Sequence, residues 1–173
     1  PHILLMKSKK VCTCMVSFRR WIKWSLLGLV ALCVAGFVAL YTLSTWSAEP
    51  TNECDVRFDN GVVLSDVPAA QTRPQQIKGL SKQTKVDKGM LFAWDAAEPR
   101  TFWMHDTWAP LSVGFFSDEG VLFSIEMMSP NTDIHHDSVN PARFALELPQ
   151  GRFEQLNLKP GSKVTHMACR LIN

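Results

Sequence analysis

Residues 121–128, VLFSIEMM, decide the class of fold that this sequence adopts. Because successive side chains of a strand point to opposite faces, the odd-numbered residues from Val121 to Met127 are predicted to share one face and the even-numbered residues the other. The preceding SDEG at 117–120 contains turn residues, and Gly120 is free to take a positive φ. The sequence therefore predicts a hairpin between the apolar run 111–116 and this strand.

Outward from this hairpin, short apolar runs separated by turn residues continue from Cys54 to the end of the chain. Two short helices are expected, at about Pro74–Leu80 and Gln150–Leu156, each with a proline at or just before its first turn. The predicted fold class is mainly β, a compact β-sandwich or barrel-like domain with one or two short helices. Further strands are expected at 54–58, 62–64, 90–94, 100–104, 144–148 and 163–171.

The N-terminal segment predicts a membrane anchor. Residues 25–43, SLLGLVALCVAGFVALYTL, carry no charge, and a helix of that length spans the ~30 Å hydrocarbon core of a bilayer. All the basic residues near this run precede it, which favours a cytoplasmic N-terminus. We expect a basic cytoplasmic tail (1–24), a transmembrane anchor or uncleaved signal (25–46) contacting the lipid bilayer, and an exported domain (49–173). A cleaved signal is the alternative, although its apolar part is usually shorter, at ~7 to 15 residues.

The charges divide between these segments. The chain has 18 Lys and Arg, 16 Asp and Glu and a net charge of +2, but six basic residues precede the first acidic one, Glu49. The remaining 12 basic and 16 acidic residues give the exported part a net charge of −4. A nucleic-acid-binding domain normally carries its basic excess on the folded part, so this division argues against nucleic acid as a partner. The expected location is the inner membrane, with the C-terminal domain in the periplasm or another extracytoplasmic space.

Two cysteines, Cys54 and Cys169, lie at opposite ends of the exported part, each in a predicted strand. In an oxidising compartment such a pair is expected to form a disulfide. Two independent buried thiols are the alternative.

Six ordered motifs carry a family resemblance. They are GLS at 79–81, GMLFAW at 89–94, RTFWMHDT at 100–107, PLSVGFF at 110–116, PARFALELPQG at 141–151 and LKPGSKV at 158–164. Together they resemble the domain of unknown function 192 family, from about Asp55 to Val164. The resemblance implies a compact, mainly β fold that is often exported behind a signal or anchor, and it implies no reaction. Two positions depart from the family pattern: Ser112, where members often have Asp, and Asp106, where they often have Asn.

Polar and aromatic residues gather in two segments. In FWMHDTW at 102–108, an extended chain sends Phe102 and Met104 to one face, which favours the core, and Trp103 and His105 to the other. An exposed tryptophan beside His and Asp is suited to stacking on a flat apolar or sugar-ring ligand. The second segment is the loop NTDIHHDS at 131–138. The candidate ligand-binding residues are Trp103, His105, Asp106, His135, His136, Asp137, Ser138 and Arg143.

No known catalytic or metal-binding spacing accompanies these residues. Neighbouring histidines in an extended chain cannot both face one centre, and HxH, HxxxH, HExxH and GxSxG patterns are absent from the sequence. We therefore predict no metal, no cofactor and no catalytic residue. Arg143 and Glu147 fall on one face of the strand at 144–148, where they can bind an anionic ligand or form an ordinary ion pair.

The leading hypothesis is a non-catalytic module of the cell envelope that binds an envelope small molecule or a membrane protein. A hydrolase or metal-dependent enzyme using His105, Asp106 and His136 is one alternative. A structural accessory subunit of a membrane complex is another.

Overall fold

The computed structural model describes residues 30, 32–37 and 48–172, which belong to two units, Pro1–Trp46 and Ser47–Asn173. In the first unit Val30 and residues 32–37 are helical. The predicted basic tail and most of the predicted anchor lie outside the described residues. In the part of the chain that is described, no helix combines the length and the apolar character needed to cross a bilayer.

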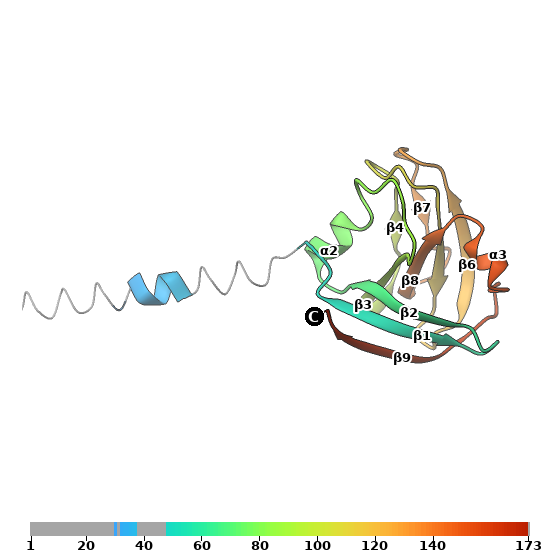
Figure 1. Ribbon diagram of the computed structural model, residues 1–173, viewed down its shortest axis with the longest axis horizontal. Helices are drawn as coiled ribbons and strands as arrows, with labels where there is room; N and C mark the ends of the chain where they lie inside the picture. Colours follow the sequence, from blue (N-terminus) through green and yellow to red (C-terminus); the bar gives the residue numbers. More distant parts are fainter. Residues whose placement is uncertain (1–29, 31, 38–47, 173) are drawn as a thin grey trace, which may run out of the picture. The chain divides into compact units, whose positions relative to one another are not determined.

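The second unit contains a seven-stranded sheet with the strand order β6-β5-β8-β3-β2-β1-β9 (Figure 1). Neighbouring strands are antiparallel except for β2 and β3. A small second sheet pairs β4 with β7, and two short helices, α2 and α3, complete the described unit. The bounds are β1 (Asn52–Phe58), β2 (Val63–Ala70), α2 (Arg73–Lys78), β3 (Met90–Glu98), β4 (Thr101–Phe102), β5 (Leu111–Phe116), β6 (Leu122–Met128), β7 (His136–Asp137), β8 (Ala142–Pro149), α3 (Arg152–Gln155) and β9 (Val164–Leu171).

The two edge strands of the large sheet meet at one corner. Val121, just before β6, forms a bridge with Lys163, just before β9. The Leu122 amide donates to the carbonyl of Ser162 at 2.9 Å. The sheet therefore rolls until its two edges touch at this corner, and the predicted mainly β class is confirmed.

The large sheet separates two apolar cores. All seven strands contribute to the core inside the roll, here called the barrel core, and α3 adds Phe153 to it. The outer core lies on the opposite face of the central strands, where it includes Phe92, Phe115 and Met128. Residues 100–109 supply Phe102 and Met104 to this second core. The central strands are thus buried on both faces.

Local sequence signals account for most of these elements. The hairpin at 117–120 forms as predicted, with Gly120 at φ 76°. Both predicted helices are confirmed at shorter lengths; α2 begins after Thr72, whose side chain forms a capping box with Gln75, and carries Pro74 in its first turn. The predicted disulfide is also confirmed, since Cys54 and Cys169 face each other across β1 and β9 with their Cα atoms 4.0 Å apart.

The face prediction for residues 121–128 is wrong at one point. Phe115 pairs with Ser124, and Phe116 with Leu122, so Phe123 is an extra residue in β6. This bulge turns the Phe123 side chain to the outer core, whereas Ile125 packs against the barrel core. One unpaired residue therefore interrupts an alternation that is regular in the sequence.

Candidate ligand-binding site

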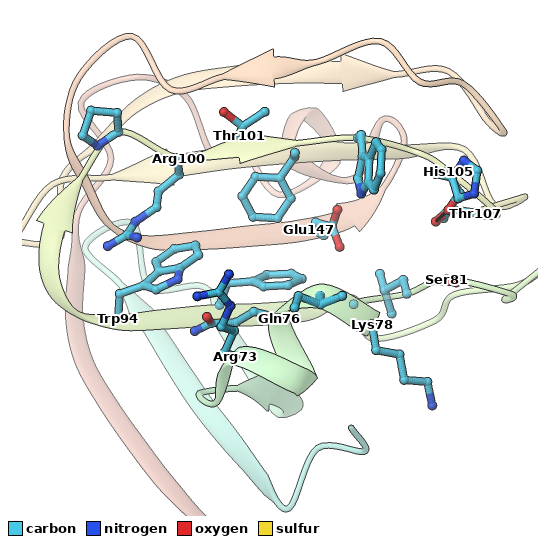
Figure 2. A pocket seen from close by; sticks show the side chains of 17 residues that line it. Arg73, Gln76, Lys78, Ser81, Trp94, Arg100, Thr101, His105, Thr107 and Glu147 are labelled. Carbon is cyan, nitrogen blue, oxygen red and sulfur yellow. Dashed lines mark hydrogen bonds between the residues drawn. The ribbon is translucent and has the colours of Figure 1, made fainter. Parts of the chain in front are cut away.

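A pocket of about 390 Å³ opens on the outer face of the sheet, between α2 and its C-terminal turn, strand β3 and the segment 99–107 (Figure 2). Its volume lies within the range of sites for small organic ligands. Four of the six motifs described above supply lining residues, including Ser81, Trp94, Arg100 and Glu147.

Glu147, in the middle of β8, is the central polar group of this pocket (Figure 2). It is 4% exposed, and its neighbours across β3 and β5 are Met90 and Val113. Within the described residues no hydrogen bond or ion pair reaches its carboxyl group. Burial alone raises the pKa of Glu147 to about 8, so the group is mostly protonated at pH 7.

Aromatic rings form much of the pocket wall. Phe92, Trp94, Phe102 and Trp103 all line it. Phe102 packs edge to face with Phe92, with ring centroids 4.9 Å apart, and with Trp94, with ring centroids 6.3 Å apart. These contacts hold the three rings in place. Trp103 is 52% exposed, which leaves its ring accessible to a ligand.

Basic side chains surround the opening. Lys78 forms an ion pair with Glu49. The Arg100 guanidinium lies 4.3 Å from the ring centre of Trp94 and donates to the carbonyl of Ala96 at 2.7 Å. Burial lowers the pKa of Arg100, an effect that Glu98 opposes. Arg73 is exposed, and no side-chain partner is found for it in the described residues.

Two glycines set the backbone around the pocket. Gly89 has a φ of 77°, and a Cβ atom there would lie 2.0 Å from the carbonyl oxygen of Glu147. Only glycine permits this approach, which brings the start of β3 against β8 beneath the pocket. Gly79 ends α2 at φ 48°, and a Cβ there would contact the Phe92 ring at 3.5 Å.

The structure places two of the predicted candidates, Trp103 and His105, in the pocket wall. Their rings stack with centroids 5.3 Å apart. The His105 Nδ1 lies 2.8 Å from an Asp133 carboxylate oxygen, and this contact, with the charge of Asp106, raises the pKa of His105. The predicted division of the strand is confirmed, since Phe102 and Met104 are buried whereas Trp103 and His105 are exposed.

The loop 131–138 is joined to this segment, so the two predicted groups do lie side by side. His136 and Asp137 form β7, which pairs with β4. The Ser138 hydroxyl accepts from the Arg100 amide at 2.9 Å, and the Thr101 hydroxyl donates to Asp137 at 2.5 Å. Asp137 and Ser138 therefore hold the segment in place. His135 instead meets the edge of Trp103, with ring centroids 6.2 Å apart.

The remaining candidates lie elsewhere or have other partners. Arg143 pairs with Asp118 at 3.2 Å, so the ordinary ion pair considered between Arg143 and Glu147 is not formed. Asp106 is not among the residues that line the pocket; it adopts φ 54°, and its carbonyl accepts from the Lys82 amide. Among the described residues, no three His, Cys, Asp or Glu side chains are grouped so that they could hold a metal ion.

The sequence reasoning missed the centre of the pocket. The sequence pattern suggests for Glu147 only an anion site shared with Arg143 or an ordinary ion pair with it, and it gives no binding role to Arg73, Gln76 or Trp94. One signal was available: Glu147 interrupts the apolar run FALEL at 144–148, and such a run is typical of a strand buried on both faces. The binding roles of the originally predicted residues stay predictions.

Comparisons with known proteins agree with this architecture. No curated protein matches the sequence. A protein of unknown function from Novosphingobium aromaticivorans DSM 12444 is similar, with 28% identity, a TM-score of 0.60 and coverage of 66% of this chain and 84% of that one. A protein described as "a putative transcription regulator" from Sinorhizobium meliloti 1021 is 25% identical, with a TM-score of 0.61 and coverage of 71% and 96%. The pattern of the family DUF192, Uncharacterized ACR, matches residues 56–166, and the chain therefore belongs to the DUF192 family.

Proposed function

We propose that the β domain is a non-catalytic binding module that holds a small organic ligand in the pocket over Glu147. One observation carries this proposal: a buried carboxyl group without a partner lies at the centre of an aromatic-walled pocket. Burying such a group costs free energy unless a hydrogen bond or a charge compensates it. A ligand that enters the pocket can supply the compensation that the described residues do not.

A fragment screen of the purified full chain tests this proposal, with tryptophan fluorescence as the signal because Trp94 and Trp103 line the pocket. Ser81→Trp places a large ring in the same pocket and should abolish binding. Ser65→Trp, at an exposed position of β2, is the matched control and should preserve it. A screen without binders, or binders that are insensitive to Ser81→Trp, would contradict the proposal.

We also propose that this module is held at the outer face of the inner membrane by residues 25–46, which contact the lipid bilayer. The uncharged run 25–43 and the basic residues before it support an anchor with a cytoplasmic N-terminus. The Cys54–Cys169 disulfide supports an oxidising compartment for the domain. Protease added to intact spheroplasts should digest the C-terminal domain. Digestion only after lysis would contradict this topology.

An acid–base enzyme is the second candidate, and the raised pKa of Glu147 favours it because such groups occur at catalytic sites. The set of His105, Asp106 and His136 has less support, since of these three only His105 lines the pocket. Each fragment that binds should be followed over time by NMR. Chemical conversion by the wild type but not by Glu147→Gln would favour the enzyme over the binding module.

A further inference from the structure

Given the proposed binding function, we propose that the ligand is a zwitterion whose cationic nitrogen lies against the Glu147 carboxylate and whose anionic group reaches Arg73. The class includes molecules of the amino acid or betaine kind. Three features of the pocket carry the inference: its central carboxyl group, its aromatic wall and its basic rim.

The central carboxyl group favours a cation. Glu147 faces the apolar side chains of Met90 and Val113 on the neighbouring strands, and no described residue supplies it with a counter-charge. An isolated carboxylate is unfavourable there, and a ligand cation removes the penalty by forming a charge pair. A neutral amide would form the hydrogen bonds of an uncharged ligand equally well, so a carboxyl group at this position is most useful when the ligand is charged.

The aromatic wall favours the same charge. The faces of aromatic rings attract cations, and this attraction strengthens away from water. One such contact already exists, since the Arg100 guanidinium lies over Trp94. Phe92, Phe102 and Trp103 also line the pocket, and Trp103, at 52% exposure, is the most accessible of these three rings.

The basic rim requires an anionic group on the same ligand. Arg73, Lys78 and Arg100 line the opening, and together they would repel a simple cation. Lys78 is paired with Glu49, and Arg100 is held by backbone carbonyls and Glu98. Arg73 is the rim cation without a side-chain partner in the described residues. Figure 2 shows Arg73 in the lower part of the view beside Gln76, with Glu147 near the centre.

Ligand charge should also be visible as proton release. The charged or titratable groups that line the pocket beside Glu147 are Arg73, Lys78, Arg100 and His105. With a pKa of about 8, Glu147 carries roughly nine-tenths of a proton at pH 7. A cation that pairs with the carboxylate expels this proton, whereas a ligand that only accepts a hydrogen bond from the acid does not.

Four probes of nearly identical shape separate the two charges. Glycine betaine carries both, choline only the cation, 3,3-dimethylbutyrate only the anion, and 3,3-dimethylbutan-1-ol neither. Quaternary nitrogen does not titrate, so protons released on binding come from the protein. Calorimetry of the full chain in a maltoside detergent at pH 7, in two buffers of different ionisation enthalpy, gives both Kd and the number of protons released.

We expect glycine betaine to bind at least about tenfold more tightly than 3,3-dimethylbutyrate and to release close to one proton. In Glu147→Gln, glycine betaine should bind no more tightly than 3,3-dimethylbutyrate. In Arg73→Gln, it should bind no more tightly than choline. Matched changes outside the pocket, Glu126→Gln and Arg152→Gln, should leave both differences in affinity unchanged. The number of protons released on binding is measured on the wild type and does not depend on any variant.

Equal affinity for betaine and 3,3-dimethylbutyrate, or betaine binding without proton release, would overturn the inference. The inference is also overturned if fragments from the screen bind but neither glycine betaine nor choline does. In that case the proposed binding function still stands. A chain that binds neither probes nor fragments contradicts the proposed function as well.

Discussion

The two faces of strand β8 meet opposite surroundings. Leu146 and Leu148 point into the barrel core, which is apolar, and Phe153 of α3 packs there against Gly114, at which a Cβ atom would lie 2.8 Å from the Phe153 ring. On the other face the same strand presents Glu147 to an open pocket. Leu146 and Leu148 therefore add apolar burial to the barrel core, whereas Glu147 is a buried carboxyl group whose desolvation is uncompensated and costs stability.

Removal of the disulfide, on the side of the barrel core, should cause the largest loss in the free energy of unfolding. The Cys54–Cys169 bridge spans 115 residues, and the chain-entropy account gives it about 4 to 5 kcal/mol. The double variant Cys54→Ala/Cys169→Ala should lower the free energy of unfolding in urea by that amount. Reductant should destabilise the wild type similarly and leave the variant unchanged. A loss below about 1 kcal/mol would mean that the bridge is dispensable.

Truncation of Phe153 tests how completely the barrel core is filled. This ring is fully buried, so Phe153→Ala should cost about 3 to 5 kcal/mol in the free energy of unfolding. Phe153→Leu should cost less because it leaves a smaller cavity. Ile77→Ala on the exposed face of α2 is the control, with an expected change near zero. An equal effect at Ile77 and Phe153 would show that burial in the barrel core does not account for the contribution of Phe153.

On the pocket side, stability should depend on pH through Glu147. The unfolded chain loses this proton near the ordinary pKa of 4.5, and the folded chain loses it near 8. Between these values the folded state keeps a proton that the unfolded state has lost, so rising pH favours unfolding. From pH 5 to 8 the wild type should lose on the order of 3 kcal/mol relative to Glu147→Gln. Parallel pH profiles of the two proteins would contradict this assignment.

The smallest effect is expected at the rim of the pocket. The hydrogen bond from His105 to Asp133 raises the pKa of the imidazole, as does the charge of Asp106. Asp133→Asn should therefore lower the pKa of His105, measured by NMR titration of its ring protons. Asp137→Asn, which alters the neighbouring β7, should leave that pKa in place. An unchanged value in Asp133→Asn would show that the contact is not formed in solution.

Local patterns were sufficient for most of the fold and for part of the site. Alternation, turn residues and cysteine placement account for both helices, the disulfide, the burial of Phe102 and Met104, and every described strand except β7. Strand β7 lies within the segment 131–138, which the sequence predicts as a loop. The bulge at Phe123 could not be predicted because it depends on the register with β5.

Glu147 was missed for a related reason. The apolar run FALEL at 144–148 indicates a strand buried on both faces, but it does not indicate that α2 and the segment 99–107 form a pocket over Glu147. Arg73 and Trp94 come from separate parts of the chain that only the tertiary fold brings to the pocket. Trp103 and His105 could be proposed because they are neighbours in one polar and aromatic segment.

Glu147 is buried and unpaired at the base of the pocket, and its pKa tests this arrangement most directly. NMR titration of the full chain with ¹³C-labelled glutamate, assigned by comparison with Glu147→Gln, follows this carboxyl carbon alone. The structure predicts a titration midpoint near pH 8 without ligand. A midpoint near 4.5 would mean that the group is solvated or paired, and it would contradict the burial of Glu147 without a partner.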